Sequence, residues 1–243
     1  METNTLPRTG ATLEPPMPEP APKPELLRSL GRLVRGLSAL FWGLPATLVV
    51  CVQTAKMDIL RPFGVLPPVF VTGWLAFGLW QLGYFQKQER IWMQALDKAK
   101  WLALINLGLS PFIYFWSRLP DQLFYNIMVL ALAVCGLLFL GALNLVLYRL
   151  TAMLPDEALR QETRYFTTLN RYLVVGIFFL GAMIFALLRF PQLLQSAGFF
   201  LQALGPTSPW LLVFLILLPL AMTMALIWKI KEVIMDSIFG SGR

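Results

Sequence analysis

Apolar residues fall into six long blocks separated by short polar connections. Crossing the hydrocarbon core of a bilayer as a helix takes about 20 mostly apolar residues. The pattern therefore predicts an all-α, polytopic integral membrane protein with six transmembrane helices in a single domain over residues 26–243. The expected spans cover about residues 37–55, 69–85, 101–116, 123–148, 172–188 and 210–228.

Tryptophan and proline refine these spans. Trp101, Trp116, Trp210 and Trp228 stand at the ends of the third and sixth blocks, where an interfacial aromatic belt is expected. Pro111 lies inside the third block and predicts a kink, because proline removes one backbone hydrogen bond. The small-residue pairs Ala182/Ala186 and Ala221/Ala225 have the spacing that allows close helix contact.

Short amphipathic segments flank the spans. Residues 25–36 place basic side chains at helical spacing between leucines, which predicts a helix lying in the headgroup plane. Residues 86–100 predict a second helix on the inner surface, with Trp92 and Leu96 on one side. Residues 157–171 predict a charged helix that runs into the fifth span. Residues 190–209 predict an interfacial or re-entrant element.

The N-terminal residues 1–25 hold seven of the 18 prolines and no long apolar run. Such a segment has no apolar face to bury, so we expect an extended, solvated, disordered cytoplasmic tail rather than a signal peptide. A spacer is one interpretation. Docking of the proline-rich stretch in an aromatic groove of a partner is the other.

Charge orients the predicted spans. Sixteen of the 20 Lys and Arg residues fall in alternate connections, and the other set of connections holds only Lys56, Arg61, Arg118 and Arg189. Because basic loops stay cytoplasmic during insertion, both termini are expected inside. We expect a multi-pass protein of a bacterial cytoplasmic (inner) membrane.

Composition separates this chain from soluble domains and from nucleic-acid binders. It is 57% hydrophobic and 14% charged, whereas charged residues make up about 25% of an ordinary soluble domain. The net charge of +7 flanks apolar spans and forms no basic face on a soluble surface, so we expect anionic lipid headgroups as partners and no nucleic acid. The residues expected to contact these lipids are Arg28, Arg32, Arg35, Lys98 and Lys100.

Catalytic chemistry has few candidates. The chain has no histidine, which removes Ser-His and Cys-His pairs and histidine metal sites. None of the 13 Asp and Glu residues falls within a predicted span, which argues against a proton-coupled pump. Cys51 and Cys135 lie in spans, without metal or redox spacing. We expect no enzyme activity, catalytic residue, cofactor or metal.

Polar side chains within the spans are the remaining candidates for a site. They could line a polar pathway, or they could form helix–helix hydrogen bonds worth about 0.6 kcal/mol each. The candidates are Gln81, Asn106, Ser110, Pro111 and Asn144, accompanied by Gln53, Thr54, Thr72 and Thr223.

Three functions remain open. The first is a membrane subunit or scaffold that works with other membrane or cytoplasmic proteins. The second is the permease subunit of a transporter, because six spans with both ends inside resemble the plan of ABC-2 type exporter permeases; this resemblance implies a separate nucleotide-binding subunit. The third is an interfacial lipid-modifying enzyme that uses Asp156, Glu157 or Glu162.

Overall fold

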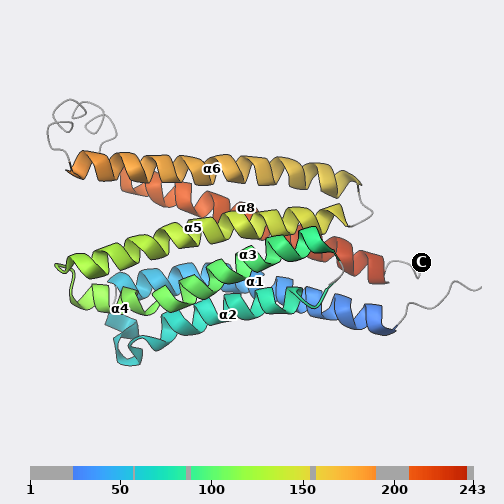
Figure 1. Cartoon of the computed structure of the whole chain (residues 1–243), viewed down its shortest axis with the longest axis horizontal. Helices are drawn as coiled ribbons and strands as arrows, with labels where there is room; N and C mark the ends of the chain where they lie inside the picture. The colour runs from blue at the N-terminus through green and yellow to red at the C-terminus, as the bar shows by residue number, and fades with distance from the viewer. Residues whose placement is uncertain (1–23, 57, 86–88, 154–156, 190–207, 240–243) are drawn as a thin grey trace, which may run out of the picture.

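The computed structural model describes residues 24–56, 58–85, 89–153, 157–189 and 208–239 (Figure 1). Within these ranges every regular element is a helix, which confirms the all-α class. The elements are α1 (Pro24–Lys56), the 3₁₀ helix η1 (Asp58–Phe63), α2 (Leu66–Leu82), α3 (Arg90–Leu109), α4 (Pro111–Arg118), α5 (Leu123–Ala152), α6 (Glu157–Arg189) and α8 (Ser208–Phe239). The predicted tail at 1–25 lies almost wholly outside the described residues, as does the element expected at 190–209.

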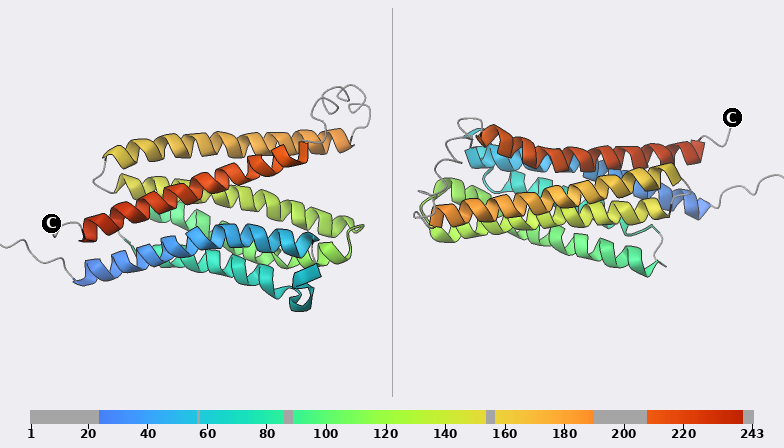
Figure 2. Two further views of the ribbon diagram at one scale, coloured as in Figure 1. Left: turned by 180° about the vertical axis from the view of Figure 1, so that it is seen from behind. Right: turned by 90° about the horizontal axis from the view of Figure 1, so that it is seen from above.

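The helices form an elongated antiparallel bundle in which α1 begins and α8 ends at the same end (Figures 1 and 2). We call this the basic end, since most of the described cations lie in the parts of the helices nearest to it. The opposite end, which holds η1 and the turn from α4 to α5, is called the far end; its described basic side chains are Lys56 and Arg118. The cations toward the basic end are Arg28, Arg32, Arg35, Arg90, Lys98, Lys100, Arg149, Arg160, Arg164, Arg171, Lys229 and Lys231.

Within the described residues, four helical segments are long and apolar enough to cross a bilayer. They are Arg28–Lys56, Leu123–Ala152, Arg160–Met183 and Phe214–Asp236. The predicted second span corresponds to α2, which is apolar but has 17 residues. The predicted third span is divided between α3 and α4 at Ser110, where Pro111 cannot donate a backbone hydrogen bond.

Two predicted interfacial helices are not separate elements. Residues 25–36 are the first turns of α1, and Leu33, Leu37 and Leu40 are buried on one continuous face across the expected boundary. Residues 90–100 are likewise the first half of α3, and Trp92 is completely buried. Burial of these apolar faces against the bundle stabilises one long helix better than a bend would. The charged helix predicted over 157–171 is the first part of α6, which continues without a break through the predicted fifth span.

Glycines allow α1 and α2 to pack closely. A Cβ atom on Gly36 would lie 2.8 Å from the carbonyl oxygen of Gly78 and would overlap the side chain of Leu82. A Cβ on Gly78 would lie 3.2 Å from the carbonyl oxygen of Gly36. Ala182, Ala221 and Ala225, whose spacing would allow close helix contact, are exposed in this chain.

The outer surface of α2 is strongly apolar. Phe70, Trp74, Phe77 and Trp80 recur at helical spacing and are each at least 45% exposed. Large exposed apolar faces on a soluble monomer are rare, whereas a helix in lipid presents them normally. The buried core lies on the inner faces of α1, α2, α3, α5 and α8 and is built mainly from leucine.

Candidate functional site

The break between α3 and α4 is built by Ser110 and Pro111. Ser110 is completely buried, and its hydroxyl donates to the Leu107 carbonyl at 2.9 Å. The Ser110 hydroxyl also lies 3.3 Å from the hydroxyl of Thr72 on α2, which donates to the Pro68 carbonyl at 2.7 Å. The break is thus a packed and hydrogen-bonded feature of the core.

Asn106 stands one turn before this break, on the same helix. Its side-chain Nδ2 donates to the carbonyl of Cys135 on α5 at 3.3 Å. Its Oδ1 is buried and accepts no hydrogen bond from the described residues. Asn106 therefore links α3 to α5 through the Nδ2 of its amide, whereas the buried Oδ1 has no hydrogen-bond partner among the described residues.

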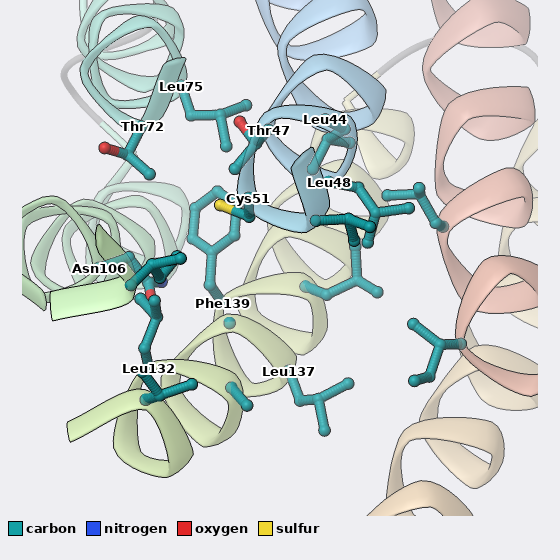
Figure 3. Close-up of a pocket in the computed structure, with 18 of the residues that line it drawn as sticks. Leu44, Thr47, Leu48, Cys51, Thr72, Leu75, Asn106, Leu132, Leu137 and Phe139 are labelled. Atoms are coloured by element: carbon teal, nitrogen blue, oxygen red, sulfur yellow. The ribbon is translucent and has the colours of Figure 1, made fainter. Parts of the chain in front are cut away.

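A cavity of about 410 Å³ lies beside Asn106 in the part of the bundle toward the far end. Figure 3 shows it bordered by Leu44, Thr47 and Cys51 on α1, Thr72 on α2 and Phe139 on α5. Ile177 of α6, together with Ile216 and Leu220 of α8, completes the opposite wall. The cavity is lined almost entirely by apolar side chains, so it is suited to an apolar occupant.

A second polar group joins α5, α6 and α8. The Thr223 hydroxyl accepts hydrogen bonds from the side-chain amides of Asn144 at 3.0 Å and Asn170 at 3.1 Å. It donates to the Pro219 carbonyl at 2.7 Å. Asn144 also donates to the Leu140 carbonyl of its own helix at 2.8 Å. We call Asn144, Asn170 and Thr223 the three-helix junction.

The inner face of α6 carries further buried polar atoms. Thr163, Thr167 and Asn170 lie at helical spacing, and Thr163 Oγ1, Thr167 Oγ1 and Asn170 Oδ1 have no hydrogen-bond partner among the described residues. Sequence reasoning missed all three because they precede the predicted fifth span. The signal that could have found them is their spacing of four and three residues, which places them on one helix face.

The predicted polar residues divide into separate groups. Asn106, Ser110 and Pro111 belong to the break beside the cavity, whereas Asn144 belongs to the three-helix junction. Gln81 lies elsewhere, beside Gly36 at the contact between α1 and α2. The structure therefore does not assemble the predicted residues into one continuous pathway.

The basic residues expected to meet lipid are mostly accessible. Arg28, Arg35 and Lys98 are exposed. The guanidinium of Arg32 lies 4.8 Å from the centroid of the Tyr84 ring. Lys100 pairs with Asp97 at 3.5 Å across one helical turn.

The structure describes the side chain of one of the three acids considered for an interfacial enzyme. Glu162 pairs with Lys229. Asp156 and the side chain of Glu157 lie outside the described residues. Among the side chains that the structure describes, no group of three or more acids or cysteines is placed to hold a metal ion.

Comparison with protein-family models, curated proteins and solved structures finds no match to this chain. The fold and the sites therefore define its class: an all-helical protein with helices suited to a membrane, a buried junction of neutral polar side chains and an apolar cavity.

Proposed function

We propose that the chain crosses a bacterial cytoplasmic membrane six times with both termini in the cytoplasm. α2 would form the second crossing and α3 with α4 the third. At about 1.5 Å per residue, α2 spans roughly 25 Å, which a slightly thinned bilayer accommodates. The common position of the α1 start and the α8 end supports an even number of crossings. The cations near that end support its cytoplasmic assignment.

Within this membrane we propose a non-catalytic role, as a subunit or scaffold of a larger complex. One observation carries the proposal: every polar side chain that is buried in the described helices is neutral. These residues are Thr54, Thr72, Asn106, Ser110, Asn144, Thr151, Thr163, Asn170 and Thr223. Acid–base catalysis and proton transfer need a titratable group at the site. Hydrogen-bonded Asn and Thr instead fix the positions of helices.

The partners proposed are other membrane or cytoplasmic protein subunits, together with anionic lipid headgroups. Affinity purification of the tagged full-length chain in a mild detergent tests the subunit role. The expected result is a protein that co-purifies at a fixed ratio and survives size-exclusion chromatography. A strictly monomeric, unaccompanied chain would contradict the proposal.

Labelling with a membrane-impermeant thiol reagent tests the topology separately. In a background with Cys51 and Cys135 replaced by alanine, Asp121→Cys should be labelled on intact cells. Arg160→Cys should be labelled only after the membrane is opened. Both side chains are exposed in the structure, so the difference would report the side of the membrane. Labelling of both positions on intact cells would reject the orientation.

A permease subunit is the second candidate, and the cavity favours it. A permease needs a space within its bundle for the transported molecule, and this chain has one bordered by seven helices. Co-purification of a nucleotide-binding protein would select this function over a scaffold. The interfacial enzyme has no comparable support; full cellular activity after combined replacement of Asp156, Glu157 and Glu162 would eliminate it.

A further inference from the structure

We propose that α6 moves away from its neighbours α5 and α8 at the basic end, and that water enters the crevice as far as the three-helix junction. The ion pair between Glu162 and Lys229 holds this crevice closed in the arrangement that the structure shows. The inference concerns a movement within this chain, so it goes beyond the subunit role proposed above and does not depend on it.

The half of α6 nearest the basic end carries polar side chains on its inner face. Thr163, Thr167 and Asn170 face the bundle, and Thr163 and Asn170 are at most 1% exposed. On the outer face of the same turns, Tyr165 is 75% exposed. A helix face that packs only for stability carries apolar residues, as Val174 does one turn further along. We call Thr163, Thr167 and Asn170 the polar face, and its composition suits contact with water.

The closed arrangement leaves the polar face without hydrogen bonds to three of its atoms. Thr163 Oγ1, Thr167 Oγ1 and Asn170 Oδ1 are buried and have no partner among the described residues. A threonine in a helix can bond to the carbonyl four residues earlier, as Thr54 and Thr72 do at 2.8 and 2.7 Å. Because the three atoms of the polar face are unsatisfied, each of them lowers the stability of the closed arrangement. Water reaches them only when α6 moves.

The position of α6 allows this movement. The helix lies at the edge of the bundle, where it packs against α5 and α8 (Figure 1). Toward the basic end α8 turns away from α6 (Figure 2, left), and there Glu162 of α6 pairs with Lys229 of α8. The two side chains are 47% and 45% exposed, so water screens the pair and it stabilises closure only weakly. A small change at this pair therefore shifts the balance toward the open crevice.

The three-helix junction sets the depth of the crevice. The Thr223 hydroxyl accepts hydrogen bonds from Asn170 at 3.1 Å and from Asn144 at 3.0 Å, so the three helices stay joined at this level. Thr163 precedes Asn170 by seven residues, which gives a crevice about 10 Å deep. A water molecule needs two or more polar partners, and the polar face supplies them along this length. Beyond the junction, the apolar Val174 supplies none.

Labelling of single cysteines measures the opening. Thr163→Cys and Thr167→Cys are made separately in the cysteine-free background described above, and the whole chain is placed in nanodiscs. The probe is a charged, membrane-impermeant methanethiosulfonate, which reaches both sides of a nanodisc, so the result does not depend on orientation. Both cysteines should be labelled, more slowly than the exposed Thr168→Cys beside them. No labelling at either position, with or without Glu162→Gln, would overturn the proposal.

Val174→Cys is the matched control for depth. Val174 lies on the same side of α6 as the polar face, beyond Asn170, and is 8% exposed. It should stay unlabelled, because the crevice ends at the three-helix junction. Equal labelling of Val174→Cys and Thr167→Cys would show that α6 leaves the bundle as a whole, and that result would also overturn the proposal.

The ion pair is tested by its effect on the labelling rate. Glu162→Gln should raise the rate at Thr167→Cys about two- to fivefold, which is the effect expected of an exposed ion pair. Exchange of the two charges, with Glu162→Lys and Lys229→Glu together, should restore the original rate. An unchanged rate in Glu162→Gln would reject this pair as the contact that closes the crevice. The subunit and topology proposals would stand in either case, since neither requires α6 to move.

Discussion

The hydroxyl of Ser110 donates a 2.9 Å hydrogen bond to the carbonyl of Leu107, which is the carbonyl that Pro111 leaves without a backbone donor. In an unbroken helix the amide of residue 111 would bond to residue 107, and proline has no amide hydrogen. The side chain next to the proline thus satisfies the group that the proline exposes. Such compensation matters within a bilayer, where no water replaces a lost partner.

Ser110→Ala should therefore destabilise the protein by about 1–3 kcal/mol, the cost of an unsatisfied buried polar group. Adding Pro111→Ala should recover part of this loss, because alanine supplies the missing N–H. Denaturant-induced unfolding in detergent micelles measures both effects. If the two substitutions act additively, the Ser110 hydroxyl does not compensate for the proline.

Thr223→Val should destabilise the protein by about 1–3 kcal/mol, because it removes the hydroxyl that accepts hydrogen bonds from the buried amides of both Asn144 and Asn170. Valine preserves the shape of threonine, so packing changes little. Thr54→Val is the control: Thr54 is also buried, and its only hydrogen bond in the described structure goes to the Val50 carbonyl of its own helix. The same unfolding assay measures both variants. If both lose the same free energy of unfolding, the hydrogen bonds of the three-helix junction do not add to the stability of the protein.

Gly36→Ala should cost about 1–3 kcal/mol, since its Cβ would collide with Leu82 and with the backbone of Gly78 at the α1–α2 contact. Gly31→Ala on the same helix meets nothing within 4 Å and should gain about 0.5–1 kcal/mol from helix propensity. Thermal unfolding followed by circular dichroism should show a lower melting temperature for Gly36→Ala and a higher one for Gly31→Ala than for the wild type. A stabilised Gly36→Ala protein would show that the helices can separate without cost.

Combined replacement of Arg28, Arg32 and Arg35 by glutamine should remove most of the stabilisation that anionic lipid gives. Basic residues near an anionic surface contribute about 1 kcal/mol each at most. The measurement is the rise in melting temperature when phosphatidylglycerol replaces phosphatidylcholine in nanodiscs. An unchanged rise in the variant would exclude these arginines as lipid contacts.

Sequence patterns predicted the regular parts of the fold. The block over 123–148 became α5 (Leu123–Ala152), because an uninterrupted apolar run admits little besides a helix in lipid. Asn144 was one of the residues considered for a polar pathway or for hydrogen bonds between helices, and its amide bonds to Thr223 on α8. Pro111 produced the predicted break through the chemistry of its own ring.

Contacts that depend on the relative placement of helices were beyond the sequence. Asn170 was not among the predicted polar sites, because it lies in the charged segment before the predicted fifth span; in the structure it contacts α8 and is 1% exposed. The close approach of Gly36 and Gly78 requires α1 and α2 to meet at one register, which neither helix encodes alone. The cavity beside Asn106 is bordered by seven helices, so no pattern within a single segment predicts it.

α8 contacts α1, α5 and α6 as it crosses the bundle obliquely (Figure 2). On the side of Thr223 toward the basic end, α8 lies against α1, where the ring centroids of Trp228 and Phe41 are 5.7 Å apart and their planes are tilted by 47°. Thr223 itself belongs to the three-helix junction. The part of α8 that contains Ile216 and Leu220 forms one wall of the cavity. If α8 tilted about Thr223, the width of the cavity beside Ile216 and Leu220 would change. The Phe41–Trp228 contact, which lies on the other side of Thr223, would change at the same time.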